Sequence, residues 1–261
     1  MTSGTVSDSA TMLRRDLRHQ LRYPSVTVML VGMPVVFLLL FVYILGGTLG
    51  AGLGGASAGR SAYVQYVVPG ILLIAVAAVT TGTAISVATD MTEGIIARFR
   101  TMAISRLAVL SGHAMGATIQ TLLSLLVVTG IALAIGFRPT TGALDWAAAL
   151  GVLVMITFSL TWVAVAMGTM AKSVETASNM PMFLLFLPFL GSGFVPTRSL
   201  PSGVSWFAAH QPFTPFIETI RGLLLGTPIG NDAVVTVIWC VTLTLGGYLW
   251  ARVSYDRRSL G

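Results

Sequence analysis

The sequence predicts an all-α integral membrane protein with six transmembrane helices. Of its 261 residues, 55% are hydrophobic and 9% are charged, whereas a soluble domain carries about 25% charged residues. The apolar residues gather in six runs, and a spanning helix needs about 20 mostly apolar residues. The arginines lie at the ends of these runs instead of forming one patch. This composition excludes a soluble domain, and the scattered arginines argue against nucleic-acid binding.

The first 25 residues are predicted to form a polar tail and an interfacial helix. Leu13, Leu17 and Leu21 repeat at intervals of four, which places them on one face of a helix. Four arginines on the other faces can reach anionic lipid: Arg14, Arg15, Arg18 and Arg22. These residues contain no apolar core followed by small residues, so no cleavable signal peptide is expected.

The transmembrane domain is predicted over residues 26–253, followed by a short tail at 254–261. The predicted spans are about 26–49, 64–88, 108–137, 146–170, 176–195 and 233–253. Pro34 is expected to kink the first span. The fifth span is short and contains Pro181 and Pro188. The single cysteine, Cys240, lies in the last span and is interpreted as a small buried hydrophobe.

The distribution of positive charge predicts the orientation. With six spans and both termini inside, eleven of the 15 Lys and Arg residues fall on the inner side and four on the outer side. Because Lys and Arg favour the cytoplasmic side of a membrane, both termini and the segment 89–106 are predicted to be cytoplasmic.

The segment 89–106 is interpreted as an amphipathic cytoplasmic helix that receives force from a soluble partner. Asp90 is predicted to cap its N-terminus, with Glu93 closing a capping box. Ile95 and Phe99 share one face, beside arginines on the polar side. The candidate coupling residues are Asp90, Glu93, Gly94, Ile95, Arg98, Phe99 and Arg100. The alternative is a solvated loop that only fixes topology.

The connection between the fifth and sixth spans, residues 196–232, is too apolar for a solvated loop. Thr214 is predicted as an N-cap, Pro215 as the first helical residue and Gly226 as the end of a short helix. About eleven residues reach only about half a bilayer, which indicates a re-entrant or interface-lying helical hairpin on the outer side. Its candidate residues are His210, Pro212, Pro215, Glu218 and Arg221. Glu218 is either a functional acid or the partner of Arg221 in a local ion pair.

Motifs for other functions are missing or out of context. The sequence from Gly50 to Gly55 fits G-x-G-x-x-G, but it follows a span instead of a strand. A P-loop is absent, because Ala171 stands where the glycine before Lys172 is required. No nucleophile, metal or acid-pair pattern supports an enzyme, and a scaffold stays open. The absence of midplane acids disfavours an ion-coupled carrier.

Aromatic side chains in the first and fifth spans are candidates for a substrate path. They are Phe37, Phe41, Phe183 and Phe186. Contact with lipid or with the protein core is the alternative interpretation for each of them.

Five short motifs carry a resemblance to a known family. They are Val68-Pro69-Gly70, Glu93-Gly94-Ile95 with Arg98-Phe99-Arg100, Phe194-Val195-Pro196, His210-Gln211-Pro212-Phe213-Thr214-Pro215 and Arg221-Gly222-Leu223. With the arginine-rich N-terminal helix, the chain resembles the permease subunit of ABC-2 type exporters, in the daunorubicin/doxorubicin-resistance permease group. Ala103 stands where the family often has proline, which blurs the end of the coupling helix.

The resemblance implies a homodimeric efflux permease in a bacterial plasma membrane, bound to two copies of a separate ATPase subunit. ATP and Mg would be bound by that partner, and no cofactor by this chain. The segment 89–106 would dock on the ATPase. The implied substrate is an amphipathic drug, antibiotic or lipid-like compound. A lipid or polysaccharide export permease of the same superfamily and an ion-coupled secondary transporter are the alternatives.

Overall fold

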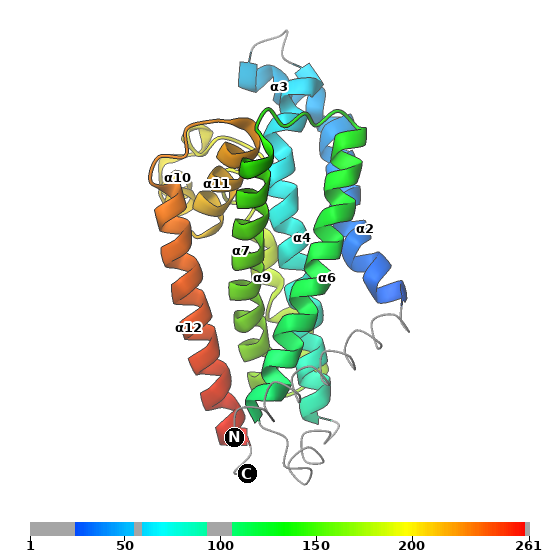
Figure 1. The fold of residues 1–261 in the computed structure, drawn as a ribbon, viewed down its shortest axis with the longest axis vertical. Helices are drawn as coiled ribbons and strands as arrows, with labels where there is room; N and C mark the ends of the chain where they lie inside the picture. Colours follow the sequence, from blue (N-terminus) through cyan, green and yellow to red (C-terminus); the bar gives the residue numbers. More distant parts are fainter. Residues whose placement is uncertain (1–23, 55–58, 93–105, 259–261) are drawn as a thin grey trace.

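The computed structural model describes residues 24–54, 59–92 and 106–258, and these residues form helices joined by turns, without a strand (Figure 1). Two predicted features lie wholly or mostly outside the described residues. They are the interfacial helix with Arg14, Arg15, Arg18 and Arg22, and the coupling segment from Glu93 onward.

Five helices of the described residues are long and apolar enough to cross a membrane. The first consists of α2 (Pro24–Leu40), a π-helical turn η1 (Phe41–Leu45) and α3 (Gly46–Gly54). The other four are α4 (Gly59–Thr92), α6 (Arg106–Ala134), α7 (Ala143–Met170) and α12 (Asp232–Arg258). The helix continues through Pro34, and its irregular turn is the π-helix that begins at Phe41.

The helix α4 is the centre of the bundle. It stands between α6 and α7 in Figure 1, and every residue from Val67 to Thr80 is buried. Its 34 residues correspond to about 51 Å at about 1.5 Å per residue, which exceeds a hydrocarbon core of about 30 Å. The ends of α4 therefore extend beyond the apolar layer. We call the end of the bundle with α3 the upper end, and the end with Thr92 the lower end (Figure 1).

The predicted fifth span is not one helix. Residues 176–195 contain α8 (Val174–Asn179) and α9 (Met182–Phe186), and turns then lead to the short 3-10 helix η2 (Thr197–Ser199). Pro181 precedes α9 and Pro188 follows it, and each removes a backbone donor that a continuous helix would need. This broken segment connects the lower end of α7 with the upper end of the bundle (Figure 1). The structure therefore does not confirm a sixth membrane helix over 176–195, and its helical pieces are separated at the two prolines of the sequence.

The broken segment packs closely on α4 through two glycines. A Cβ atom added at Gly70 would lie 2.7 Å from both the Cα and the carbonyl oxygen of Gly193. Residues 191–194 are all buried, so this irregular backbone is covered by protein, as non-helical backbone at membrane depth must be. The Val68-Pro69-Gly70 motif thus places a small residue where two backbones meet.

Replacing Gly70 with leucine is expected to destabilise the bundle by about 1–3 kcal/mol, because a side chain there must push two backbones apart. Unfolding is measured by heating the protein in mild detergent with a fluorogenic maleimide, since the only thiol, Cys240, is buried. The matched control is Gly130→Leu in α6, where an added Cβ meets nothing within 4 Å. Equal effects of the two substitutions would contradict the close packing.

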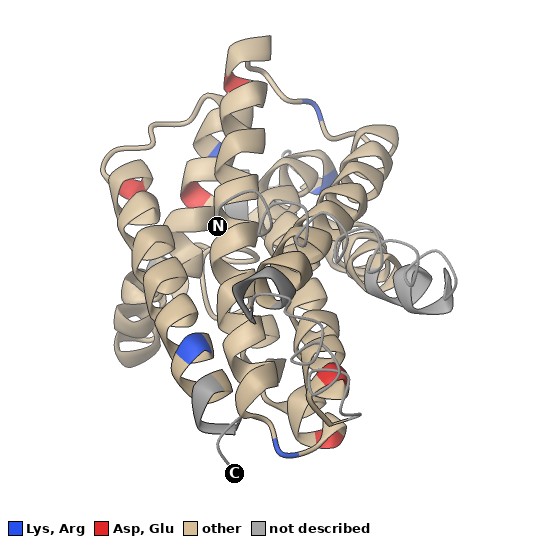
Figure 2. Cartoon of the chain, turned by 60° about the horizontal axis from the view of Figure 1, so that its bottom comes forward, with Lys and Arg blue, Asp and Glu red and all other residues tan. Residues whose placement is uncertain are grey.

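The outer faces of the bundle are apolar. Large aliphatic side chains such as Val36 (61% exposed), Ile44 (71%) and Leu126 (72%) lie on the surface. Figure 2 shows that long stretches of the helices carry no Lys, Arg, Asp or Glu. A continuous apolar surface of this kind requires an apolar surrounding, so the chain is an integral membrane protein.

Two helices close the upper end, α10 (Ser202–His210) and α11 (Phe213–Leu225). Trp206 and Phe207 of α10 are exposed, whereas α11 is buried over most of its length against α4, α7 and α12. Its buried residues include Phe213, Phe216, Ile217, Ile220 and Leu224. α11 is therefore part of the packed bundle.

Candidate functional site

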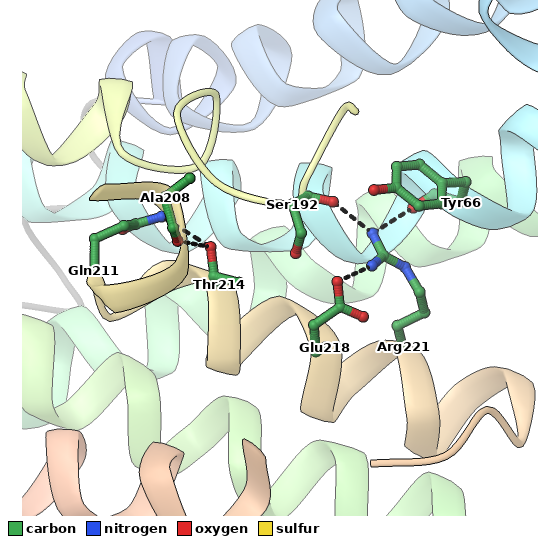
Figure 3. Close-up of polar contacts among 7 residues, drawn as sticks. All are labelled: Tyr66, Ser192, Ala208, Gln211, Thr214, Glu218 and Arg221. Atoms are coloured by element: carbon green, nitrogen blue, oxygen red, sulfur yellow. Dashed lines mark hydrogen bonds and ion pairs between the residues drawn. The ribbon is translucent and has the colours of Figure 1, made fainter. Parts of the chain in front are cut away.

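α11 starts at Phe213, two residues earlier than predicted, and its N-cap is Pro212 instead of Thr214. Pro212 precedes the helix, and the backbone N–H of Phe213 donates to Oε1 of Gln211 over 3.0 Å. Thr214 is not the N-cap. Its hydroxyl donates to the carbonyl oxygen of Ala208 over 2.5 Å, which joins α10 to α11 (Figure 3). Gly226 ends the helix as predicted, in the left-handed conformation with φ of 70°.

Arg221 holds three separate segments together at the upper end (Figure 3). One nitrogen, Nη1, donates to Oε1 of Glu218 over 2.5 Å, which confirms the predicted pair. The other, Nη2, donates to the carbonyl oxygens of Tyr66 in α4 over 3.1 Å and of Ser192 over 2.8 Å. The guanidinium also lies 4.0 Å from the centre of the Tyr66 ring. With its side chain 7% exposed, Arg221 is a buried cation with partners on α11, α4 and the broken segment.

The connection between α6 and α7 forms a second set of hydrogen bonds at the upper end. Gln65 of α4 donates to the carbonyl oxygen of Gly136 over 3.0 Å and accepts from the backbone N–H of Arg138 over 3.1 Å. Thr140 and Thr141 donate their hydroxyls to carbonyl oxygens in the last turn of α11, over 2.7–3.2 Å. These bonds satisfy carbonyls that a helix end leaves free, and they fix α11 to its neighbours.

The remaining hairpin candidates lie around the α10–α11 corner. The ring of His210 stacks on that of Trp206 at 4.7 Å, and its Nδ1 lies 2.7 Å from the Trp206 carbonyl oxygen. Pro212 is the residue before α11, and Pro215 is buried in its first turn. His210 and Pro215 therefore shape the corner, whereas Glu218 and Arg221 lie further along α11.

An aromatic cluster joins the first membrane helix to the broken segment. Phe41 lies 4.3 Å from Phe194 between ring centres, and Phe37 lies 5.5 Å from Phe189. The rings of Phe189 and Phe194 are stacked at 4.5 Å. Beside the cluster is a cleft of about 150 Å³, large enough for about one aromatic ring. Its lining residues are Thr48, Leu49, Gly52, Phe194, Val195, Pro196 and Ser199.

Only half of the predicted aromatic path is brought together. Phe37 and Phe41 are partly buried in the cluster, whereas Phe183 and Phe186 lie on α9 with 53% and 51% of their surfaces exposed. A helical period over the fifth span places Phe183 and Phe186 side by side, but the broken backbone brings Phe189 and Phe194 inward instead. Phe194 was missed because its neighbour Phe41 is far away in the sequence.

The lower end contains Asp90, which is not the N-cap of a separate helix. It lies inside α4, which continues to Thr92, and its Oδ2 is 3.1 Å from Nε2 of His113 in α6. Both side chains are buried, at 8% and 10% exposed. The sequence concealed this partner, because His113 has no acidic neighbour along the chain. Glu93, Gly94, Ile95, Arg98, Phe99 and Arg100 lie outside the described residues.

The described residues contain no group of three or more His, Cys, Asp or Glu side chains that could hold a metal ion. Lys172, the only lysine of the sequence, lies in the turn between α7 and α8. The charged residues thus lie towards the two ends of an apolar bundle (Figure 2), in an arrangement suited to holding helices in place.

Comparisons with known proteins place the chain in a family. Residues 9–225 match the family described as ABC-2 type transporter. The daunorubicin resistance ABC transporter permease protein DrrB1 of Streptomyces coeruleorubidus is 30% identical over 241 residues, which cover 92% of this chain and 82% of that protein. The probable doxorubicin resistance ABC transporter permease protein DrrC of Mycobacterium tuberculosis H37Rv is 24% identical over 190 residues, which cover 72% and 69%.

Proposed function

Because the chain belongs to the ABC-2 type transporter family, we propose that it is the membrane subunit of an ATP-driven exporter for an amphipathic compound. Membrane subunits of ABC transporters act with a partner ATPase, and this chain has no P-loop of its own. The ATPase is a separate protein that binds ATP and Mg. Two copies of it act with two copies of this permease in a bacterial plasma membrane.

The observation that carries the proposal is the match of the sequence to the ABC-2 type transporter family. The structure supports it with an apolar bundle whose charged residues lie towards its two ends (Figure 2). The lower end is the cytoplasmic one, since Lys172 and Arg252 lie there and Lys and Arg favour the cytoplasmic side. α4 ends and α6 begins at this end, and residues 93–105 connect them in the sequence. The connection's Glu93, Gly94, Ile95, Arg98, Phe99 and Arg100 supply the contact with the ATPase.

The broken segment between α7 and α10 is the fifth crossing of six, so that both termini are cytoplasmic. The cluster of Phe37 and Phe41 with Phe189 and Phe194, beside its cleft, supports a route for a compound with aromatic or acyl parts along this side. The upper end is closed by α11, which is held by Arg221, Thr140 and Thr141.

Uptake into inside-out vesicles tests this function. The vesicles contain this chain with a P-loop ABC ATPase from the same organism, and the probes are doxorubicin, ethidium and a fluorescent phospholipid. We expect ATP to drive uptake of a drug probe, with no effect of a protonophore. Uptake that a protonophore abolishes would favour an ion-coupled carrier, and movement of the phospholipid alone would favour a lipid exporter.

A further inference from the structure

A buried polar pair joins the lower ends of α4 and α6. Oδ2 of Asp90 lies 3.1 Å from Nε2 of His113, and the two side chains are 8% and 10% exposed. Asp90 stands two residues before the end of α4 at Thr92, and His113 stands about two turns into α6, which begins at Arg106. The pair therefore bridges the two helices between which residues 93–105 run.

The hydrogen bond between Asp90 and His113 is directional, whereas the apolar contacts around it are not. Val87 of α4 and Leu110 and Ala114 of α6 are buried in one hydrophobic cluster beside it. The hydrophobic effect is non-directional, so among these side chains the polar pair adds a contact with a defined direction between α4 and α6. A hydrogen-bonded carboxylate and imidazole have a preferred distance and angle. Separating the pair would also leave the buried Asp90 without this partner, which is unfavourable.

We propose that Asp90 and His113 are positioning residues that hold the two ends of the 93–105 connection at a fixed spacing for binding of the ATPase subunit. This inference rests on the proposed function. A fixed spacing between the ends of α4 and α6 presents the connection's two attachment points in one geometry, so less conformational entropy is lost when the ATPase binds. The pair acts through the connection, so loss of the pair weakens binding of the ATPase.

The test measures the Kd between the full chain in lipid nanodiscs and the P-loop ABC ATPase from the same organism that is used in the vesicle assay. Asp90→Ala and His113→Ala are each expected to weaken binding about tenfold, within the range for residues that share one interaction. The double variant is expected within about twofold of either single variant, because the second substitution removes an interaction already lost. Asp90→Asn and His113→Gln keep hydrogen-bonding groups in place and are expected to bind nearly as well as the unmodified chain.

A matched control is available at the upper end of the bundle. The hydroxyls of Thr219 in α11 and Thr236 in α12 are 3.1 Å apart, so they also form a buried polar pair between helices. Thr219→Val should leave the Kd unchanged. Folding of each variant is checked by heating with the thiol probe of Cys240. If the alanine variants do not fold, His113→Phe keeps the ring without the nitrogen and is expected to bind about tenfold more weakly.

Several results would overturn the inference. One is an unchanged Kd in a folded Asp90→Ala, His113→Ala or His113→Phe variant, and another is an additive loss of binding in the double variant. The others are conservative variants that bind the ATPase as weakly as the alanine variants, and an equal loss of binding in Thr219→Val. Failure of the unmodified chain to bind the ATPase would instead overturn the proposed function, and this inference with it.

Discussion

Replacing Arg221 with methionine is expected to lower the free energy of unfolding by about 2–4 kcal/mol, because it removes a partly buried ion pair and two hydrogen bonds from a charged donor to backbone carbonyls. Methionine occupies a similar volume but donates no hydrogen bond. Glu218 then loses its cation, and the carbonyl oxygens of Tyr66 and Ser192 lose the donor that joins them to α11. The loss is measured by thermal unfolding in detergent, followed through labelling of Cys240.

Arg60 provides the matched control for this substitution. Its guanidinium lies 5.0 Å from the centre of the Tyr43 ring, but Arg60 is exposed, whereas Arg221 is buried 4.0 Å from Tyr66. Because water can solvate the groups around an exposed arginine, Arg60→Met should change stability by less than about 0.5 kcal/mol. If Arg221→Met were equally mild, Arg221 would not be the residue that joins the three segments.

Reversing the charge of Glu93 is expected to reduce ATP-driven export at least about tenfold, which corresponds to about 1.4 kcal/mol. Under the proposed function, Glu93 lies in the connection that contacts the ATPase. A reversed charge in a docking segment replaces an attraction with a repulsion, which costs several kcal/mol in protein interfaces. Uptake of the drug probe into inside-out vesicles measures the effect of Glu93→Arg, together with the amount of permease in the membrane.

Glu175→Arg controls for the change of net charge. Glu175 lies in the first turn of α8, exposed and near the same end of the bundle, but outside the connection between α4 and α6. This variant should export normally. Normal export by Glu93→Arg at normal membrane levels would rule out the coupling role of that residue, and a loss in both variants would indicate a general charge effect.

The helices of the bundle were largely predictable, because length and hydropathy dominate in a membrane. The predicted span over 64–88 corresponds to α4, and that over 146–170 corresponds to α7, each with a few more residues at the ends. The extra turns contain polar residues, so a prediction from runs of apolar residues leaves them out. This is why Asp90 was assigned to a new helix, although it lies in the last turn of α4.

The interruption of the predicted fifth span has a different cause. Its composition is that of a membrane helix, but Pro181 and Pro188 interrupt the backbone hydrogen bonds, and Gly193 packs against Gly70. Hydropathy measures how apolar a segment is and not whether its backbone is continuous. In the broken segment Phe183 and Phe186 are exposed, and Phe189 and Phe194 join the aromatic cluster instead.

The polar ties were predictable only where both partners are close in the sequence. Glu218 and Arg221 are three residues apart, and that pair was expected and is present. The other partners of Arg221 are the carbonyl oxygens of Tyr66 and Ser192, which any residue could supply. Asp90 and His113 are separated by an entire connection, so a pattern along one helix could not reveal them.

The mass of the complex formed with the neighbouring P-loop ATPase tests the central claim most directly. The two proteins are co-expressed, extracted in mild detergent, purified through a tag on this chain and weighed by native mass spectrometry. We predict two copies of this permease with two copies of the ATPase, and loss of the ATPase from the Glu93→Arg variant. A chain that purifies without any ATPase would contradict the assignment of this protein as the membrane subunit of an ATP-driven exporter.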